Sequence, residues 1–213
     1  MEFAENLKRL DDQRDGGGSN QVERDILRVR IEKLRDMEAE LDHEVKALRK
    51  SIQLSARQAL IDHYGEGSIQ VFLDIKGSES SAIQTISLRL WYDTPHTAWT
   101  FLQQIQAGVW NGANFSIQQG RALVAEPEGG NRVLPNLDFV ESSERGHERY
   151  TITLMDTSLA INLQDNRKQY RQEACVGVIF EGFDVLHQVV KESQDGDVKI
   201  VQFRAKHMTS PGY

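Results

Sequence analysis

The chain has 213 residues, of which 39% are hydrophobic and 27% are charged, and its 25 Lys and Arg against 32 Asp and Glu give a net charge of −7. This composition is that of a soluble globular protein with room for one medium-sized domain and an appendage. The acidic balance argues against a general nucleic-acid-binding surface, and no apolar run approaches the roughly 18 residues of a membrane span. Cys175 is the only cysteine, which excludes an internal disulfide and favours a reducing compartment.

Residues 1–20 are predicted to form a flexible tail. They combine a charged stretch, which is unlike a secretory signal, with the run Gly16-Gly17-Gly18-Ser19. Such a run lacks the apolar content needed to fold and is typical of a joint. Its origin can be natural or engineered.

Residues 21–66 are predicted to contain one long helix. From Val22 to about Tyr64 there is no Gly or Pro, and the stretch is dominated by residues most of which favour helix. At 1.5 Å per residue this helix would be about 65 Å long. Its apolar residues keep a seven-residue period, and the predicted coiled-coil seam consists of Leu27, Ile31, Leu34, Glu38, Leu41, Val45, Leu48 and Ile52.

The seam indicates association, but it leaves the partner open. Leucine at the d positions and β-branched residues at most a positions favour two parallel strands, while Glu38 at an a position either weakens the middle or sets partner and register. Two flanking pairs would attract between parallel copies and one would repel: Glu23 with Arg28, Glu44 with Arg49, and Arg30 with Arg35. A homodimer, a different partner chain, packing of the helix on the following domain, and a spacer role beneath a lost membrane anchor all remain open.

Residues 67–207 are predicted to form a β-rich domain, followed by a short tail at 208–213. From residue 69 the apolar period changes to two, and residues 69–91 are typical of a β-hairpin. Helices are predicted from Pro95 to near Gly108 and around 183–190. Further strands are expected at 113–117, 121–125, 150–155, 159–163, 175–180 and 198–203. This pattern predicts a mainly β fold with some α, as a closed β-barrel with a helix at each end.

Four segments in the expected order resemble the cyclophilins, a family of peptidyl-prolyl cis-trans isomerases. Residues 94–101 are similar to the family's P-x-T-A-x-x-F element, and 110–115 to its Y-x-G-x-x-F stretch. Residues 159–163 resemble the F-F-I strand, and 177–185 resemble the G-K-V-x-x-G-x-D-V run. The resemblance implies a cyclophilin-like barrel over most of residues 68–205.

The catalytic positions of the family are not retained. The family's arginine, whose guanidinium donates to the prolyl nitrogen as the amide twists, is matched by Ile117. The phenylalanine and glutamine that follow are matched by Ala122 and Ala125, or by Arg121 and Val124 if one residue is gapped. The second phenylalanine of F-F-I is matched by Ala160, and the family's Trp and His have no counterpart in 167–174.

We therefore assign no catalytic residue. A candidate peptide groove comprises Phe115, Ile117, Arg121 and Ala160, and Arg121 either replaces the lost guanidinium or is a solvated or structural arginine. The six histidines lack metal-ligand spacing, Cys175 is expected to be a buried strand residue, and no cofactor is predicted.

The sequence predicts a non-catalytic cyclophilin-like interaction or scaffold module that dimerises or binds a protein partner through residues 21–64. The alternative is a weakly active peptidyl-prolyl isomerase that acts on proline-containing protein segments. A proline-containing peptide is a possible ligand under both hypotheses.

Overall fold

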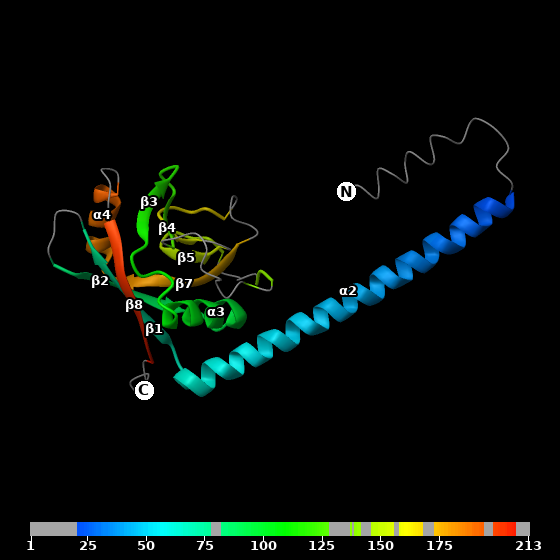
Figure 1. Cartoon of the computed structure of the whole chain (residues 1–213), viewed down its shortest axis with the longest axis horizontal. Coiled ribbons are helices and arrows are strands. Elements are labelled where there is room, and N and C mark those ends of the chain that lie inside the picture. Colours follow the sequence, from blue (N-terminus) through cyan, green and yellow to red (C-terminus); the bar gives the residue numbers. More distant parts are fainter. Residues whose placement is uncertain are drawn as a thin grey trace. The chain divides into compact units, whose positions relative to one another are not determined.

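The computed structural model describes residues 21–77, 82–127, 137, 139–141, 146–155, 158–167, 173–193 and 198–207 (Figure 1). The predicted tails at 1–20 and 208–213 lie outside the described residues. The chain divides into two compact units, Met1–Leu48 and Arg49–Tyr213. In the part of the chain that the structure describes, no helix is both long enough and apolar enough to cross a membrane.

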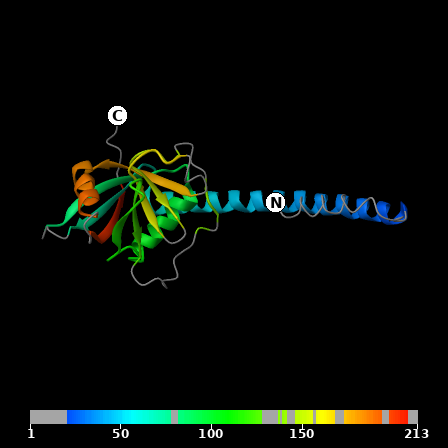
Figure 2. The ribbon, with the colours of Figure 1, turned by 90° about the horizontal axis from the view of Figure 1, so that it is seen from above.

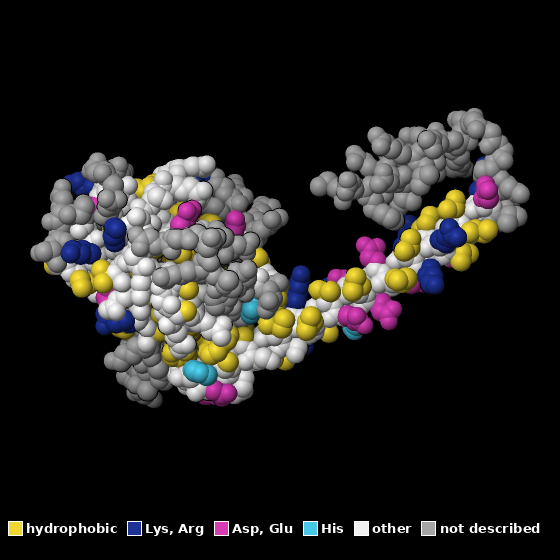
Figure 3. All heavy atoms as spheres, viewed as in Figure 1, with side chains coloured by type: hydrophobic (Ala, Val, Ile, Leu, Met, Phe, Trp, Pro, Cys, Tyr) yellow, Lys and Arg dark blue, Asp and Glu magenta, His cyan; other side chains and the backbone are white. Residues whose placement is uncertain are grey.

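The long helix predicted from the sequence is α2, which runs without a break over Gln21–Tyr64. Within the first unit its seam leucines are solvent-exposed, with 52–62% of each side chain accessible at Leu27, Leu34, Leu41 and Leu48. Figure 3 shows hydrophobic side chains at the surface along this helix. The first unit therefore presents an apolar seam with nothing packed on it among the described residues.

The last four turns of α2 belong to the barrel unit. Leu60 is fully buried in the same core cluster as the barrel side chains. The Arg49 guanidinium lies 5.6 Å from the centre of the Phe139 ring, and the rings of His63 and Trp99 are 5.0 Å apart. The unbroken heptad pattern did not reveal this change of role along the helix.

The second unit contains the predicted closed barrel, in which every strand pairs antiparallel with its neighbours. The order around the barrel is β1-β2-β7-β5-β6-β4-β3-β8, and β8 closes it by pairing with β1. Figures 1 and 2 show the barrel from two directions. The strands are β1 Ile69–Lys76, β2 Gln84–Leu90, β3 Asn114–Gln118, β4 Ala122–Glu126, β5 Thr151–Leu154, β6 Leu159–Asn162, β7 Ala174–Glu181 and β8 Val198–His207.

Alternation along each strand separates the barrel interior from its outer surface. Along β1, Val71, Leu73 and Ile75 are buried in the main core cluster. The intervening Asp74 is on the outer surface, where it accepts hydrogen bonds from Arg204 of β8 at 2.8 and 2.9 Å. Successive side chains of a strand point to opposite faces, so the period-two pattern read from the sequence correctly identified the interior.

Two helices, α3 (Pro95–Gln106) and α4 (Phe183–Glu192), lie at opposite ends of the barrel (Figures 1 and 2). Thr94 occupies the N-cap position of α3, but its hydroxyl donates to the carbonyl of Cys175 rather than capping the helix. The carboxylate of Glu141 takes that role, because one of its oxygens accepts from the Thr97 backbone N–H at 2.7 Å and from the Thr97 hydroxyl at 2.9 Å. The predicted helix start at Pro95 is confirmed, and the side-chain acceptor at this end comes from a segment distant in sequence.

Glycines at two positions of the cyclophilin-like segment 177–185 have steric roles. A Cβ on Gly177 would lie 2.4 Å from the backbone oxygen of Arg89, so only glycine permits β2 and β7 to approach this closely. Gly182 has φ of 84° and starts α4, and a Cβ there would meet the Thr85 carbonyl at 2.8 Å. These contacts give a physical reason for the glycine spacing noted in the sequence.

Candidate functional site

The candidate site is the outer surface of β4, β6 and β5. The strand register aligns Val124 with Ala160 and Ala160 with Thr153, so these three side chains form a row across the strands. Ala122, Val124 and Ala160 form a small buried apolar cluster with the partly buried Met155, separate from the barrel core. Ala122 and Ala160 are fully buried, so their methyl groups do not line an open proline-sized pocket.

The positions matched to the family's catalytic residues do not share one surface. Ile117 packs against the barrel core, and its register partner Leu123 belongs to that core. Ala125 is also in the core cluster, whereas Ala122 and Ala160 lie in the outer cluster. The predicted set is therefore divided between the two sides of the barrel wall.

The candidate groove residues are divided in the same way. Phe115 is buried in the barrel core and Ala160 is on the outer surface. The exposed members of β3 are Asn114, Ser116 and Gln118, and they alternate with the buried Phe115 and the half-buried Ile117. The Ser116 hydroxyl donates to the carbonyl of Val124 at 3.4 Å. Because successive side chains of a strand point to opposite faces, the sequence alone would have placed Ser116 and Gln118 on the face opposite to Phe115.

Arg121 lies just beyond a tight turn. Gln119 and Gly120 both have positive φ, 51° and 67°, and the Arg121 N–H donates to the Gln118 carbonyl at 2.9 Å. The Arg121 carbonyl accepts from the Leu163 N–H at 2.8 Å, so its backbone fastens the hairpin to the segment after β6. Among the described residues, its side chain makes no hydrogen bond or ion pair that would hold a guanidinium in place for catalysis.

A buried polar network continues the site across β5 and β7. The Asn162 amide donates to the hydroxyls of Thr151 and Thr153, each at 3.0 Å, and the Asn166 amide donates to Asn162 Oδ1 at 2.8 Å. These residues come from β5, β6 and the segment that follows β6. The network supplies partners for polar groups that would otherwise be costly to bury.

His147 and Cys175 complete this network. The Cys175 thiol donates to the Gly146 carbonyl at 3.0 Å, and His147 Nδ1 is 3.1 Å from Cys175 Sγ and 2.9 Å from the Thr153 hydroxyl. Burial raises the pKa of the Cys175 thiol to about 11, against the smaller opposing effect of the threonine hydroxyls. Burial also lowers the pKa of His147, although Glu173 opposes that shift. The pair is a neutral imidazole beside a protonated thiol, which is a structural arrangement rather than an activated nucleophile.

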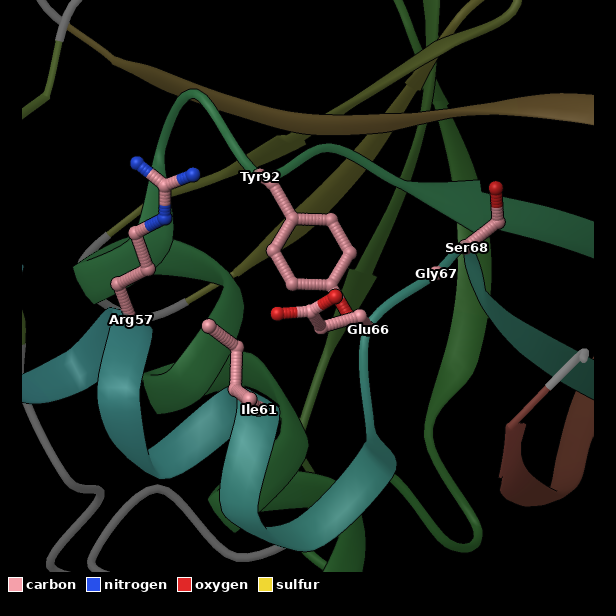
Figure 4. A pocket seen from close by; sticks show the side chains of 6 residues that line it. All are labelled: Arg57, Ile61, Glu66, Gly67, Ser68 and Tyr92. Carbon is pink, nitrogen blue, oxygen red and sulfur yellow. The ribbon is translucent and has the colours of Figure 1, made fainter.

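A separate cavity of about 480 Å³ lies where the end of α2 meets the barrel (Figure 4). It is lined by Arg57, Ile61, Glu66, Gly67, Ser68 and Tyr92. The Tyr92 hydroxyl donates to the Gly65 carbonyl at 3.3 Å, and burial raises the pKa of this phenol. The cavity shares no residue with the predicted groove. Among the described residues, no group of three or more His, Cys, Asp or Glu side chains could hold a metal ion.

Comparison with known proteins identifies the fold. No protein-family profile and no curated protein matches the sequence. A crystal structure of a cyclophilin-type peptidyl-prolyl cis-trans isomerase from Cryptosporidium parvum is similar, with a TM-score of 0.56 and 11% identity over 67% of this chain and 100% of that one. The same enzyme in the presence of the dipeptide Ala-Pro gives a TM-score of 0.54 and 12% identity over 66% of this chain and 99% of that one. The chain therefore has the cyclophilin fold, as the sequence resemblance predicted.

Proposed function

We propose that this protein is a non-catalytic interaction module, in which a cyclophilin-fold barrel is joined to a helix that mediates association. The observation that carries the proposal is the environment of Ile117. This residue occupies the position matched to the family's arginine, and its side chain packs against the barrel core instead of reaching the outer surface.

The chemistry of prolyl isomerisation explains why this position matters. A cis-trans rotation crosses a barrier of about 18–20 kcal/mol because the twisted amide loses its resonance. In the family, a fixed guanidinium stabilises the twisted amide by donating to the prolyl nitrogen, and loss of one such preorganised donor typically lowers the rate by about 100- to 1,000-fold. An isoleucine cannot donate, and its orientation leaves no place for a donor at residue 117.

The outer cluster supports the same proposal. A proline ring needs an open apolar pocket, but the alanines at 122 and 160 are fully buried with Val124. The helix supports the proposed role in association. In the first unit of the chain it exposes a row of leucines that a surface helix without a partner does not normally carry.

The decisive experiment is a protease-coupled isomerase assay on an Ala-Pro peptide, with three versions of the full chain. The unmodified protein is expected to give no rate above the uncatalysed background. Ser116→Arg would place a guanidinium on the outer surface beside Val124, and any gain of activity would identify the missing donor as the reason for inactivity. Ile117→Arg is the matched control, because it would direct the same charge into the core and is expected to destabilise the barrel without restoring activity.

A clear outcome would contradict the proposal. If the unmodified protein reproducibly accelerates isomerisation above the uncatalysed background, the barrel is catalytic and the proposal fails. The alternative of a weakly active isomerase would then be favoured.

A further inference from the structure

We infer that the seam of α2 pairs with the seam of a second copy of this chain in antiparallel orientation, with Leu34 of each helix opposite Glu38 of the other. This inference rests on the proposed function, because it names the partner and the geometry of the association helix.

Between Leu27 and Leu48 the exposed apolar seam is interrupted once, by the charge of Glu38, and Arg24 occupies the a position that precedes Leu27. Leu27, Leu34, Leu41 and Leu48 are all more than half exposed, and the exposed Glu38 lies among them. A large exposed apolar surface on a soluble protein normally marks an interaction site. The orientation of the partner therefore depends on where the carboxylate of Glu38 and the flanking charges are placed.

A parallel, in-register dimer places several like charges together. The two Glu38 side chains would share one core layer, and Arg30 would face Arg35 of the other copy on both sides. Of the attractive pairs read from the sequence, the one between Glu44 and Arg49 is compromised, because the Arg49 guanidinium lies over the Phe139 ring within the barrel unit. Side-chain shape at the a and d positions favours parallel strands, but the charges oppose that orientation.

An antiparallel pair centred on residue 36 separates the two carboxylates. Its layers match residues whose numbers sum to 72: Leu27 with Val45, Ile31 with Leu41, Leu34 with Glu38, and Arg24 with Leu48 of the second copy. Each Glu38 then faces an apolar leucine rather than a second carboxylate. In this orientation the e positions of the two helices line the same edge, so Arg35 of the second copy lies at almost the same height as Glu38 and can neutralise it.

The outer edges of this pair are also complementary. Antiparallel helices bring e positions beside e positions and g positions beside g positions, which pairs Arg28 with Asp42 and Arg30 with Glu44 twice each. Asp42 already pairs with Lys46 of its own helix at 2.6 Å, but both side chains are more than 60% exposed, so that pair leaves the second carboxylate oxygen open. The like-charged contact that remains is between the two Arg35 side chains, and each of these has Glu38 of the other copy beside it.

The length of the overlap agrees with the division of the chain. The antiparallel layers use residues 24–48 alone, and the barrel unit begins at Arg49. A parallel seam would extend to Ile52, which is already half-buried within the barrel unit. The antiparallel pair therefore needs no rearrangement of the turns of α2 that pack with the barrel.

Single-cysteine crosslinking of the full chain tests the orientation. In the antiparallel pair the two copies of residue 37 lie about 3 Å apart along the axis, while the two copies of residue 27 lie about 27 Å apart, at 1.5 Å per residue. We therefore expect Met37→Cys to form a disulfide-linked dimer under mild oxidation and Leu27→Cys not to do so. The parent protein is the control, because its Cys175 thiol is buried and hydrogen-bonded.

A charge reversal at Arg30 gives a second test, because it should weaken an antiparallel dimer and strengthen a parallel one. Arg30→Glu would place two carboxylates together in the antiparallel pair and would relieve the contact between Arg30 and Arg35 in a parallel one. By sedimentation of the full chain, we expect the dimer to weaken roughly 5- to 30-fold, from two symmetric surface pairs.

The outcomes separate this inference from the proposed function. Crosslinking at residue 27 but not at 37, or a tighter dimer for Arg30→Glu, would overturn the antiparallel orientation and leave the association helix intact. A monomer at every concentration up to about 100 µM, with neither cysteine crosslinked, would overturn self-association. In each case the isomerase assay still decides separately whether the barrel is non-catalytic.

Discussion

The substitution Leu60→Ala tests whether the last four turns of α2 are part of the barrel domain. Leu60 is fully buried and belongs to the main core cluster, although it lies on the same unbroken helix as the exposed seam. Truncation removes three carbon atoms from a packed site, and it leaves a cavity because the surrounding side chains relax only partly.

The expected loss follows from this burial. Leucine-to-alanine changes at fully buried sites cost about 3–5 kcal/mol. In a unit of about 165 residues, each kcal/mol lost from the free energy of unfolding lowers Tm by about 2–4 °C, so Tm should fall by about 6–20 °C. Differential scanning calorimetry and a urea titration of the full chain measure the change independently.

Leu54→Ala is the matched control. Leu54 lies on the same helix and in the same unit, but 59% of its surface is exposed and it is outside the predicted seam. Its truncation should change the free energy of unfolding by no more than about 0.5 kcal/mol. Equal effects at both positions, or a change below about 1 kcal/mol at Leu60, would refute the assignment of these turns to the barrel core.

Three further predictions concern titratable groups. Burial lowers the pKa of His147 below its unfolded value near 6.5. The free energy of unfolding should therefore fall as the pH drops through about 6.5 and become constant below the folded pKa. In urea titrations at pH 5 and pH 7.5, His147→Gln should show a smaller difference in the free energy of unfolding between the two pH values than the parent protein, and an equal difference would contradict the assignment. The Cys175 thiol, with its pKa of about 11, should react with Ellman's reagent at pH 8 only when urea unfolds the protein, so rapid stoichiometric reaction of the native protein would show that the site is open. At Asp74, burial alone would raise the pKa of the carboxyl, but hydrogen bonds from Arg204, Thr85 and Gln202 together lower it. The contribution of this carboxylate to the free energy of unfolding is therefore complete above about pH 4 and is lost as the pH falls. Asp74→Asn should therefore cost about 1–3 kcal/mol at pH 7 and converge with the parent protein near pH 2, and a constant difference across that range would exclude the carboxylate as the cause.

The regular features of the fold were predictable from the sequence because they depend on local periodicity. The alternation at residues 69–76 and the heptads of 21–64 each report a repeating face, and β1 and α2 confirm both. The segments similar to the cyclophilins gave the barrel type, and the glycines in 177–185 have the steric roles that such spacing indicates.

The site was predicted less completely, because it depends on register and on contacts distant in sequence. Matching by position gave the residue type at Ile117 but not its side of the strand, which is set by pairing with Leu123. The polar network draws His147, Asn162 and Cys175 from three separate segments, and no local pattern links them. For the same reason the sequence located the start of α3 but not the carboxylate that caps it.

That capping carboxylate has a consequence for the order of folding. The hydrogen bonds between Glu141 and Thr97 join residues 44 positions apart. They can form only after the intervening chain has closed into a loop and has lost the corresponding conformational entropy. Helix α3 is thus completed by tertiary structure, and its first turn lacks this acceptor in any intermediate where the segment around Glu141 has not docked. The stability of α3 therefore depends on the topology of the whole barrel. The contacts at its N-terminus are among the non-local contacts that slow the folding of β-rich domains.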